Sequence, residues 1–256
     1  MKSNVCKFTI FLIACCVVVL PAVAADSKVV SYKSGDETIS GVMYWPARAD
    51  KAAKPLPAIV VIHEWWGLNG WIKEQAEKFA DLGYVTLAVD LYRGKVATTP
   101  DEAHELMRGL PEDRSVRDMK AAVAFLKTQK NVDAKRIGAI GWCMGGSRTA
   151  VLAVNEPTLA AAVINYGGLP SDLETVKNIN AAVLGLFGGQ DRGIPVESVK
   201  TFESQLKSLG KKVEVKVYPE AGHAFENPNN KSGYRADDAA DAWSRQVKFF
   251  ESTLKK

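Results

Sequence analysis

A glycine-framed turn constrains the fold of this 256-residue chain more than any other stretch. Residues 136–142 read as a short apolar β-strand, and residues 147–153 read as the helix that follows it. Between them lies Gly-Trp-Cys-Met-Gly, the Gly-x-nucleophile-x-Gly pattern of a nucleophile elbow, with Cys143 at its centre. A side chain at Gly141 or Gly145 would collide with the neighbouring strand or helix. The alternative interpretation is a glycine-rich strand-to-helix turn that holds a buried, unreactive cysteine.

Strands and helices alternate along most of the chain. Strands are predicted at residues 29–32, 39–44, 58–62, 85–89, 161–165, 182–187 and 213–218, and helices at 72–82, 102–108, 116–128, 196–209 and 237–254. The first two strands read as an antiparallel pair that turns at Gly35, and residues 47–57 read as a surface loop. This alternation predicts a doubly wound, mostly parallel sheet with helices on both faces. Residues 25–256 are expected to form one α/β domain.

The N-terminus resembles a secretory signal peptide over residues 1–24. Lys2 and Lys7 supply a basic start, residues 8–20 are apolar, and Ala-Val-Ala precedes Ala25, the expected mature N-terminus. The alternative is a lipoprotein anchored at Cys15, which the apolar sequence beyond that cysteine argues against. Either leader predicts export, and a bacterial periplasm is the simplest destination.

Charge and cysteine content narrow the possible partners. Removal of Lys2 and Lys7 would lower the formal net charge of +4 by two. The positive and negative charges of the mature chain would then be too nearly balanced to favour binding to nucleic acid or to an anionic membrane surface. The apolar leader is short for a stable membrane span. The other three cysteines lie within the leader, so the mature chain would carry only Cys143 and no internal disulfide. A lone thiol in an oxidising compartment favours a working nucleophile.

Polar residues with useful chemistry follow four of the predicted strands. Open α/β sheets place their working sites beyond the carboxyl ends of the strands. Glu64, Cys143, Asp191 and His223 all follow such ends. The chain order of nucleophile, acid and histidine is that of an α/β-hydrolase triad. Taken alone, however, Asp191 is equally consistent with an ordinary turn residue after two glycines.

The other two histidines fit this arrangement less well. His63 precedes the candidate nucleophile, so we expect it to shape the pocket. His104 lies in a polar predicted helix and is expected to be solvated. Neither histidine shows metal-ligand spacing with His223 or Cys143, so no metal site is predicted.

Several blocks together resemble the dienelactone hydrolase family across residues 29–253. They are Glu64-Trp65-Trp66-Gly67, Asp90-Leu91-Tyr92, Gly141-Trp142-Cys143-Met144-Gly145-Gly146, Phe187-Gly188-Gly189-Gln190-Asp191 and Ala221-Gly222-His223-Ala224-Phe225. The resemblance implies an α/β-hydrolase fold that hydrolyses an ester or lactone without a cofactor. It assigns Cys143 as nucleophile, Asp191 as acid, His223 as base, Glu64 as a carboxylate beside the thiol, and the backbone N–H groups of Met144 and Trp65 as the oxyanion hole.

The expected substrate pocket departs from the family pattern. Trp65, Trp66 and Trp71 are expected to form an apolar wall, although core packing explains them almost as well. Family members that act on dienelactone carry an arginine after the active-site histidine, and here that position is Asn227. A second family arginine corresponds to Arg93, with a spacing that differs by about one residue. Trp66, Arg93 and Asn227 are therefore the candidate substrate-binding residues, and neutral substrates are expected.

The sequence thus predicts an exported hydrolase with a Cys143–His223–Asp191 triad. Its expected partner is a small-molecule ester or lactone, with no cofactor and no metal. The competing interpretation is a non-catalytic binding or thiol-sensing protein on the same fold. The sequence does not determine the oligomeric state, and a monomer is expected.

Overall fold

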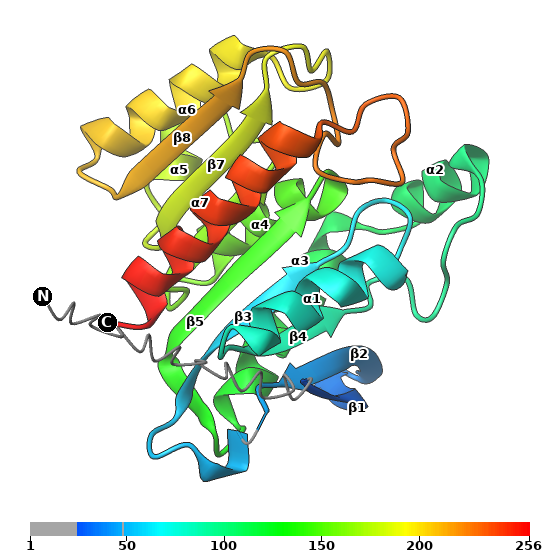
Figure 1. The fold of residues 1–256 in the computed structure, drawn as a ribbon, viewed down its shortest axis with the longest axis vertical. Helices are drawn as coiled ribbons and strands as arrows, with labels where there is room; N and C mark the ends of the chain where they lie inside the picture. The colour runs from blue at the N-terminus through cyan, green and yellow to red at the C-terminus, as the bar shows by residue number, and fades with distance from the viewer. Residues whose placement is uncertain (1–24, 48) are drawn as a thin grey trace, which may run out of the picture.

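A computed structural model describes residues 25–47 and 49–256. Its strands form one sheet in the order β1-β2-β4-β3-β5-β6-β7-β8. Strand β1 pairs antiparallel with β2, and β2 pairs antiparallel with β4, whereas every other neighbouring pair is parallel. The structure thus confirms the predicted mostly parallel sheet with an antiparallel opening (Figure 1).

The elements follow one another in the predicted alternation. The strands are β1 (Asp26–Ser34), β2 (Glu37–Trp45), β3 (Leu56–Ile62), β4 (Val85–Val89), β5 (Val132–Trp142), β6 (Ala161–Asn165), β7 (Ala182–Gly188) and β8 (Val213–Tyr218). The helices are η1 (Ala49–Lys51), α1 (Gly70–Asp81), α2 (Pro100–Arg108), α3 (Glu112–Lys127), α4 (Met144–Asn155), α5 (Leu173–Val176), α6 (Val196–Ser208) and α7 (Ala236–Leu254).

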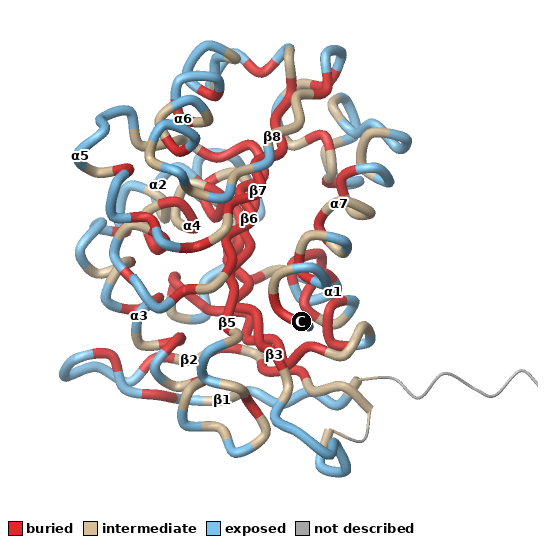
Figure 2. The backbone as a smooth tube through the Cα atoms, turned by 90° about the vertical axis from the view of Figure 1, so that its left-hand side faces the viewer, coloured by how far each residue is buried: buried red, intermediate tan, exposed pale blue. Residues whose placement is uncertain are grey.

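The sheet separates two layers of helices (Figure 2). Helices α1 and α7 cover one face, where Ile72, Phe79 and Phe250 join one hydrophobic cluster. Helices α3, α4 and α6 lie on the other face, where Val123 and Phe202 join a second cluster. The central strands are buried on both faces, which is why β3 and β4 are nearly continuous apolar runs.

Strand register brings the predicted site residues to one edge of the sheet. Ile62, the last residue of β3, pairs with Gly141 of β5, and Trp142 pairs with Asn165 at the end of β6. These strands are parallel, so the loops that leave their carboxyl ends begin next to one another. The segments that carry Glu64 and Cys143 therefore start side by side.

Several local boundaries differ from the sequence prediction: β1, β2, β5, α1, α2 and α4 shift by one to four residues at one or both ends, and larger changes occur elsewhere. The predicted loop at 47–57 contains the short helix η1, and β3 already begins at Leu56. Helix α3 begins at Glu112, because charged residues that lack apolar periodicity still complete its first turns. The four-residue helix α5 was not predicted, and Asp172 caps it by accepting a hydrogen bond from Thr175 N.

The predicted leader at residues 1–24 lies outside the described residues. In the part of the chain that the structure describes, no helix combines the length and the apolar character that a membrane crossing needs.

Candidate active site

Cys143 lies in a strained turn between β5 and α4. Its φ is 56° and its ψ is −117°, a conformation that side-chain-bearing residues rarely adopt. A Cβ at Gly141 would lie 2.1 Å from the Gly145 carbonyl oxygen, and one at Gly145 would lie 2.2 Å from the Ile62 carbonyl oxygen. Both framing glycines are therefore required by close backbone approach, as predicted. The turn leaves Cys143 half-buried at the start of α4.

His223 and Asp191 form a hydrogen-bonded pair. His223 Nδ1 lies 2.7 Å from Asp191 Oδ2, and the Asp191 side chain is almost fully buried. Asp191 Oδ1 also accepts hydrogen bonds from the backbone N–H groups of Gly193 and Ile194. Burial raises the pKa of Asp191, but the bond to His223 and these backbone donors outweigh it and hold the pKa below its usual range. Asp191 is thus fixed as an anion against Nδ1.

This pairing leaves the other nitrogen of His223, Nε2, for proton transfer. Burial lowers the pKa of His223, but the hydrogen bond to Asp191 and the adjacent Cys143 outweigh this effect and raise the pKa to about 10. The imidazolium form is thus favoured, and an imidazolium is the partner that stabilises a thiolate. The side chain remains 41% exposed, so a substrate can reach it.

Glu64 is buried with a single side-chain hydrogen-bond donor. Asn227 Nδ2 donates to Glu64 Oε2 over 2.6 Å. Burial raises the pKa of Glu64 to about 7, and the bond from Asn227 and the nearby His223 offset only part of that rise. Both protonation states of Glu64 are therefore populated near neutral pH, as a group that exchanges a proton requires.

These groups meet in one cavity of about 730 Å³. It is lined by Glu64, Trp65, Trp66, His104, Met107, Cys143, His223, Ala224, Asn227, Asn229, Asn230, Lys231 and Ser232. Trp65 packs edge-on against Trp66 and His104 and makes one side aromatic. The structure thus brings Cys143, His223 and Glu64 together beside an apolar wall.

Of the residues that carry the predicted oxyanion donors, Trp65 lines the same cavity, and Met144 directly follows Cys143, which lines it. Met144 is the first residue of α4, and N–H groups in the first turn of a helix have no intrahelical acceptor. Trp65 follows Glu64 in the β3–α1 loop and lines the cavity. Tyr92 Oη donates to Met144 Sδ over 3.2 Å.

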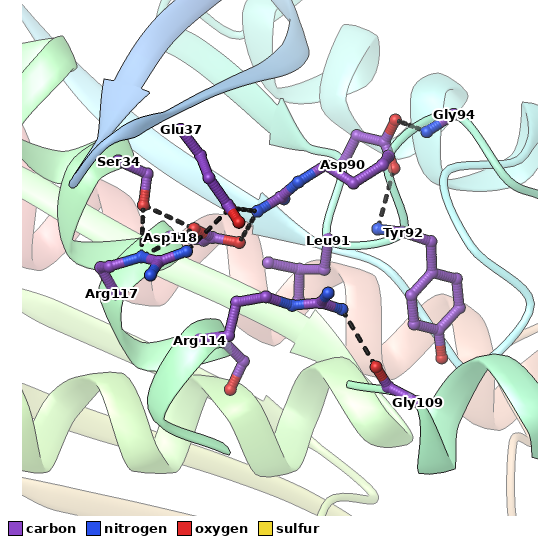
Figure 3. A network of polar contacts seen from close by, with 12 residues as sticks. Ser34, Glu37, Asp90, Leu91, Tyr92, Gly94, Gly109, Arg114, Arg117 and Asp118 are labelled. Atoms are coloured by element: carbon purple, nitrogen blue, oxygen red, sulfur yellow. Dashed lines mark hydrogen bonds and ion pairs between the residues drawn. The ribbon is translucent and has the colours of Figure 1, made fainter. Parts of the chain in front are cut away.

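The structure does not place Arg93 in this cavity, so its expected contact with substrate is wrong. Arg93 pairs with Glu37 and Asp118, with both distances 2.7 Å. Figure 3 shows Glu37, Asp118 and Arg117 converging at this point, where the β1–β2 turn meets α3. The buried Asp118 carboxylate needs a cation, and Arg93 is held there as its partner. None of the described residues that line the cavity is an arginine.

Three other expectations need correction. Trp71 packs against Trp142 in the core and does not join the aromatic wall. His104 is exposed on α2, as expected for a solvated residue, but its ring contacts Trp65 and lines the cavity. His63 is fully buried behind the site and does not line the cavity. Its Nε2 accepts from Leu91 N, so Nδ1 carries the proton and donates to Glu64 O.

Asn227 lines the cavity, but its side chain is already engaged. Its amide nitrogen donates to Glu64, and its oxygen accepts from Asn229 N. The rim that follows, residues 229–232, also lines the cavity and was not predicted from the sequence. The run of asparagines there is typical of a turn, and that signal could have placed the rim.

No group of three or more His, Cys, Asp or Glu side chains within residues 25–47 and 49–256 is arranged to hold a metal ion. The arrangement of Cys143, His223 and Asp191 suits nucleophilic chemistry by the side chains themselves.

The parallel sheet, the strained elbow and the histidine that follows the last strand define an α/β-hydrolase. The model of the dienelactone hydrolase family matches residues 39–254, and the chain belongs to that family. A protein of Methylorubrum extorquens, provisionally named carboxymethylenebutenolidase, is 36% identical over 210 residues, which are 77% of this chain and 72% of the relative.

Solved structures agree with this classification. A Klebsiella pneumoniae protein, provisionally named dienelactone hydrolase, superposes with a TM-score of 0.79 at 29% identity, covering 89% of this chain and 98% of that one. A dienelactone hydrolase-like promiscuous phosphotriesterase from metagenomic libraries superposes with a TM-score of 0.82 at 27% identity, covering 90% and 99%. The predicted family and fold are thereby confirmed.

Proposed function

We propose that this chain hydrolyses a carboxylic ester or lactone through a thiol nucleophile, Cys143, with His223 as base and Asp191 orienting the histidine. The carrying observation is the strained cysteine that shares a cavity with a histidine whose Nδ1 lies 2.7 Å from a buried aspartate. Membership of the dienelactone hydrolase family and the name of the Methylorubrum extorquens relative support this class of reaction.

The proposed reaction has two halves. His223 Nε2 holds the proton of Cys143 in a thiolate–imidazolium pair, and the thiolate sulfur attacks the carbonyl carbon. The carbonyl oxygen becomes an oxyanion that the N–H groups of Met144 and Trp65 stabilise. When the intermediate collapses, the ester C–O bond breaks and His223 returns its proton to the departing alkoxide. Water, deprotonated by His223, then hydrolyses the acyl-thioester, which releases the acid and restores the thiol.

We assign Glu64 an auxiliary role in this scheme. It lies in the same cavity as Cys143, and its pKa of about 7 lets it accept and release a proton near neutral pH. In its ionised form, Glu64 is a second acceptor for the thiol proton beside His223.

A panel of chromogenic esters and lactones, assayed with the wild type and Cys143→Ala, tests the proposal. Turnover by the wild type and none by Cys143→Ala is the expected result. A folded wild type that turns over no member of the panel, but whose thiol reacts rapidly, would favour the competing thiol-sensing interpretation. Full activity in Cys143→Ala would overturn the nucleophile assignment.

We further propose that neutral substrates are hydrolysed at least as well as their carboxylate analogues. Arg93 is paired with Asp118, and Asn227 is an uncharged amide that donates to Glu64, so neither gives the cavity a cation for a substrate carboxylate. Lys231 is the lysine on the exposed rim. We would compare kcat/KM for a matched neutral and acid-bearing lactone in the wild type and Lys231→Ala. A hundredfold wild-type preference for the acid would contradict the proposal, and its loss in Lys231→Ala would assign the recognition to the rim.

We also propose that residues 1–24 are a secretory signal and that the enzyme works outside the cytoplasm as a soluble protein. The basic start, the apolar run and the small residues before Ala25 support this proposal.

A further inference from the structure

Glu226 is a buried carboxyl that the proposed reaction does not use. Its Oε2 accepts hydrogen bonds from Trp142 Nε1 over 3.1 Å and from Gln246 Nε2 over 2.7 Å. Trp142 is fully buried and directly precedes Cys143, whereas Gln246 is fully buried on α7. Glu226 therefore joins the residue before the nucleophile to the helix that covers this face of the sheet.

The contacts continue from Gln246 around the elbow. Gln246 Nε2 also donates to Asn165 Oδ1 over 3.1 Å. Asn165 Nδ2 donates to the Gly141 carbonyl oxygen over 3.0 Å, and the Asn165 carbonyl oxygen accepts from Cys143 N over 3.0 Å. Each of the three consecutive residues 141–143 is thus held by one buried network.

The same carboxyl belongs to the segment that carries the candidate base. Glu226 lies three residues after His223, and the next residue, Asn227, donates to Glu64. A displacement of Glu226 would therefore move the elbow and the histidine segment relative to each other.

We propose that Glu226 is a positioning residue, which in its neutral form holds the nucleophile elbow and the histidine segment in register. The inference rests on the proposed function, because it acts through Cys143 and His223. It adds a group that neither the family resemblance nor the reaction scheme requires.

The surroundings of Glu226 favour the neutral form. Within the described residues Glu226 makes no ion pair, and its Oε1 is buried without a hydrogen-bond partner. Burial raises the pKa of Glu226 to about 8, which the bonds from Trp142 and Gln246 offset only in part, and Glu64 adds to the rise. A buried carboxylate without a cation is costly even with two donors, so ionisation favours a displacement of Glu226 out of the network toward water in the cavity that it lines.

The other groups that face this carboxyl provide no close compensation. Besides Glu64, the titratable groups around it are Tyr166 and Tyr218. Glu226 also lines a cavity separate from the active-site cavity, and the titratable residues that border it are Glu74, Lys78, Asp81 and Tyr234. Lys78 is already paired with Glu74. We therefore expect the elbow to lose its register as the pH rises through the pKa of Glu226.

The test compares the wild type with Glu226→Gln, Glu226→Ala and Glu220→Ala. Glutamine keeps the shape and can accept both bonds without ionising. Glu220 is an exposed residue of the same connection and is the matched control. For each protein we would measure kcat and KM on a neutral ester and the rate of Cys143 alkylation, from about pH 6 to about pH 9.5.

Glu226→Ala should lose about ten- to a hundredfold in kcat with little change in KM, because misplacement of reacting groups costs rate more than binding. The kcat of Glu226→Gln should stay within about threefold of the wild-type value at pH 7, and it should not show the decline near pH 8 that we expect for the wild type. Glu220→Ala should match the wild type. Equal kcat in Glu226→Ala and Glu220→Ala would overturn the proposal, as would a Glu226→Gln variant as impaired as Glu226→Ala.

Two further measurements keep the result decisive. If Glu226→Ala does not fold, the comparison of Glu226→Gln with the wild type decides, and an unchanged decline near pH 8 overturns the proposal. Tryptophan fluorescence would be measured against pH in the wild type and in Glu226→Gln. The difference between the two curves, which reports the contact of Glu226 with Trp142, should show a titration near pH 8. This signal does not depend on turnover, so an active Cys143→Ala variant would refute the proposed nucleophile while leaving the Glu226 contact testable.

Discussion

The hydrogen bond from Asn227 favours the ionised form of Glu64. Removing this donor and replacing it by a cation should therefore shift the pKa of Glu64 in opposite directions. In the wild type a single amide donates to Glu64 over 2.6 Å, and the pKa of the carboxyl is about 7. A hydrogen bond to an ionised group contributes about 1.5–3 kcal/mol. Its removal in Asn227→Leu penalises only the ionised form, so the pKa of Glu64 should rise by about one to two pH units.

Asn227→Arg should do the reverse. A guanidinium within hydrogen-bonding distance favours the ionised carboxylate and should lower the pKa of Glu64 by about one to three units. If ionised Glu64 assists removal of the thiol proton, the acid limb of kcat/KM on a neutral ester should move to higher pH in Asn227→Leu and to lower pH in Asn227→Arg. Carbon-13 NMR of the carboxyl, assigned with Glu64→Gln, measures the pKa directly. Acid limbs that coincide while the NMR titrations move apart would refute the role assigned to Glu64, and NMR titrations that coincide would refute the electrostatic argument itself.

Other predictions address the elbow, the ion pair and the leader. Gly145→Ala should destabilise the protein by about 3 kcal/mol or more, because the new Cβ meets backbone oxygen, whereas Gly70→Ala has open space and should have little effect on the melting temperature. Arg93→Met should destabilise the protein by about 1–3 kcal/mol, because buried Asp118 loses its nearer cation and keeps only Arg117 Nε at 3.7 Å, yet the ratio of kcat/KM for neutral and acid-bearing substrates should stay unchanged. The intact mass of the exported protein should correspond to a chain that starts at Ala25, and the mass of a lipid-modified species would contradict this prediction.

Features that depend on local pattern could be predicted from the sequence. The elbow at Cys143 was recognisable because its glycines are required by neighbouring backbone. The base and its carboxylate were recognisable because residues after parallel strands gather at one edge of the sheet. Strand limits at β4 and β6 were predicted to the residue, since both strands are buried, nearly continuous apolar runs between turns. The limits of β8 were also predicted to the residue, from the alternation of apolar and charged residues in a partly exposed strand.

Partnerships between distant side chains could not be predicted in the same way. Arg93 has almost the spacing of a substrate-binding arginine, but Asp118 on α3 takes it, and only the packing of α3 against the β1–β2 turn reveals this. Glu226 reads in the sequence as an ordinary opposing charge near the pocket. Its burial against Trp142 depends on where α7 crosses the sheet, which no local pattern specifies.

Residues 25–256 contain one cysteine, and the lack of a second one determines how oxidation of Cys143 can be reversed. A thiolate oxidised to the sulfenic acid is rescued most readily by a second cysteine, which condenses with it and blocks the irreversible sulfinic state. Cys143 has no such resolving cysteine in this part of the chain. Its repair therefore depends on a thiol supplied by another molecule, and because Cys143 is half-buried in the lining of a cavity, that thiol must be able to enter the cavity.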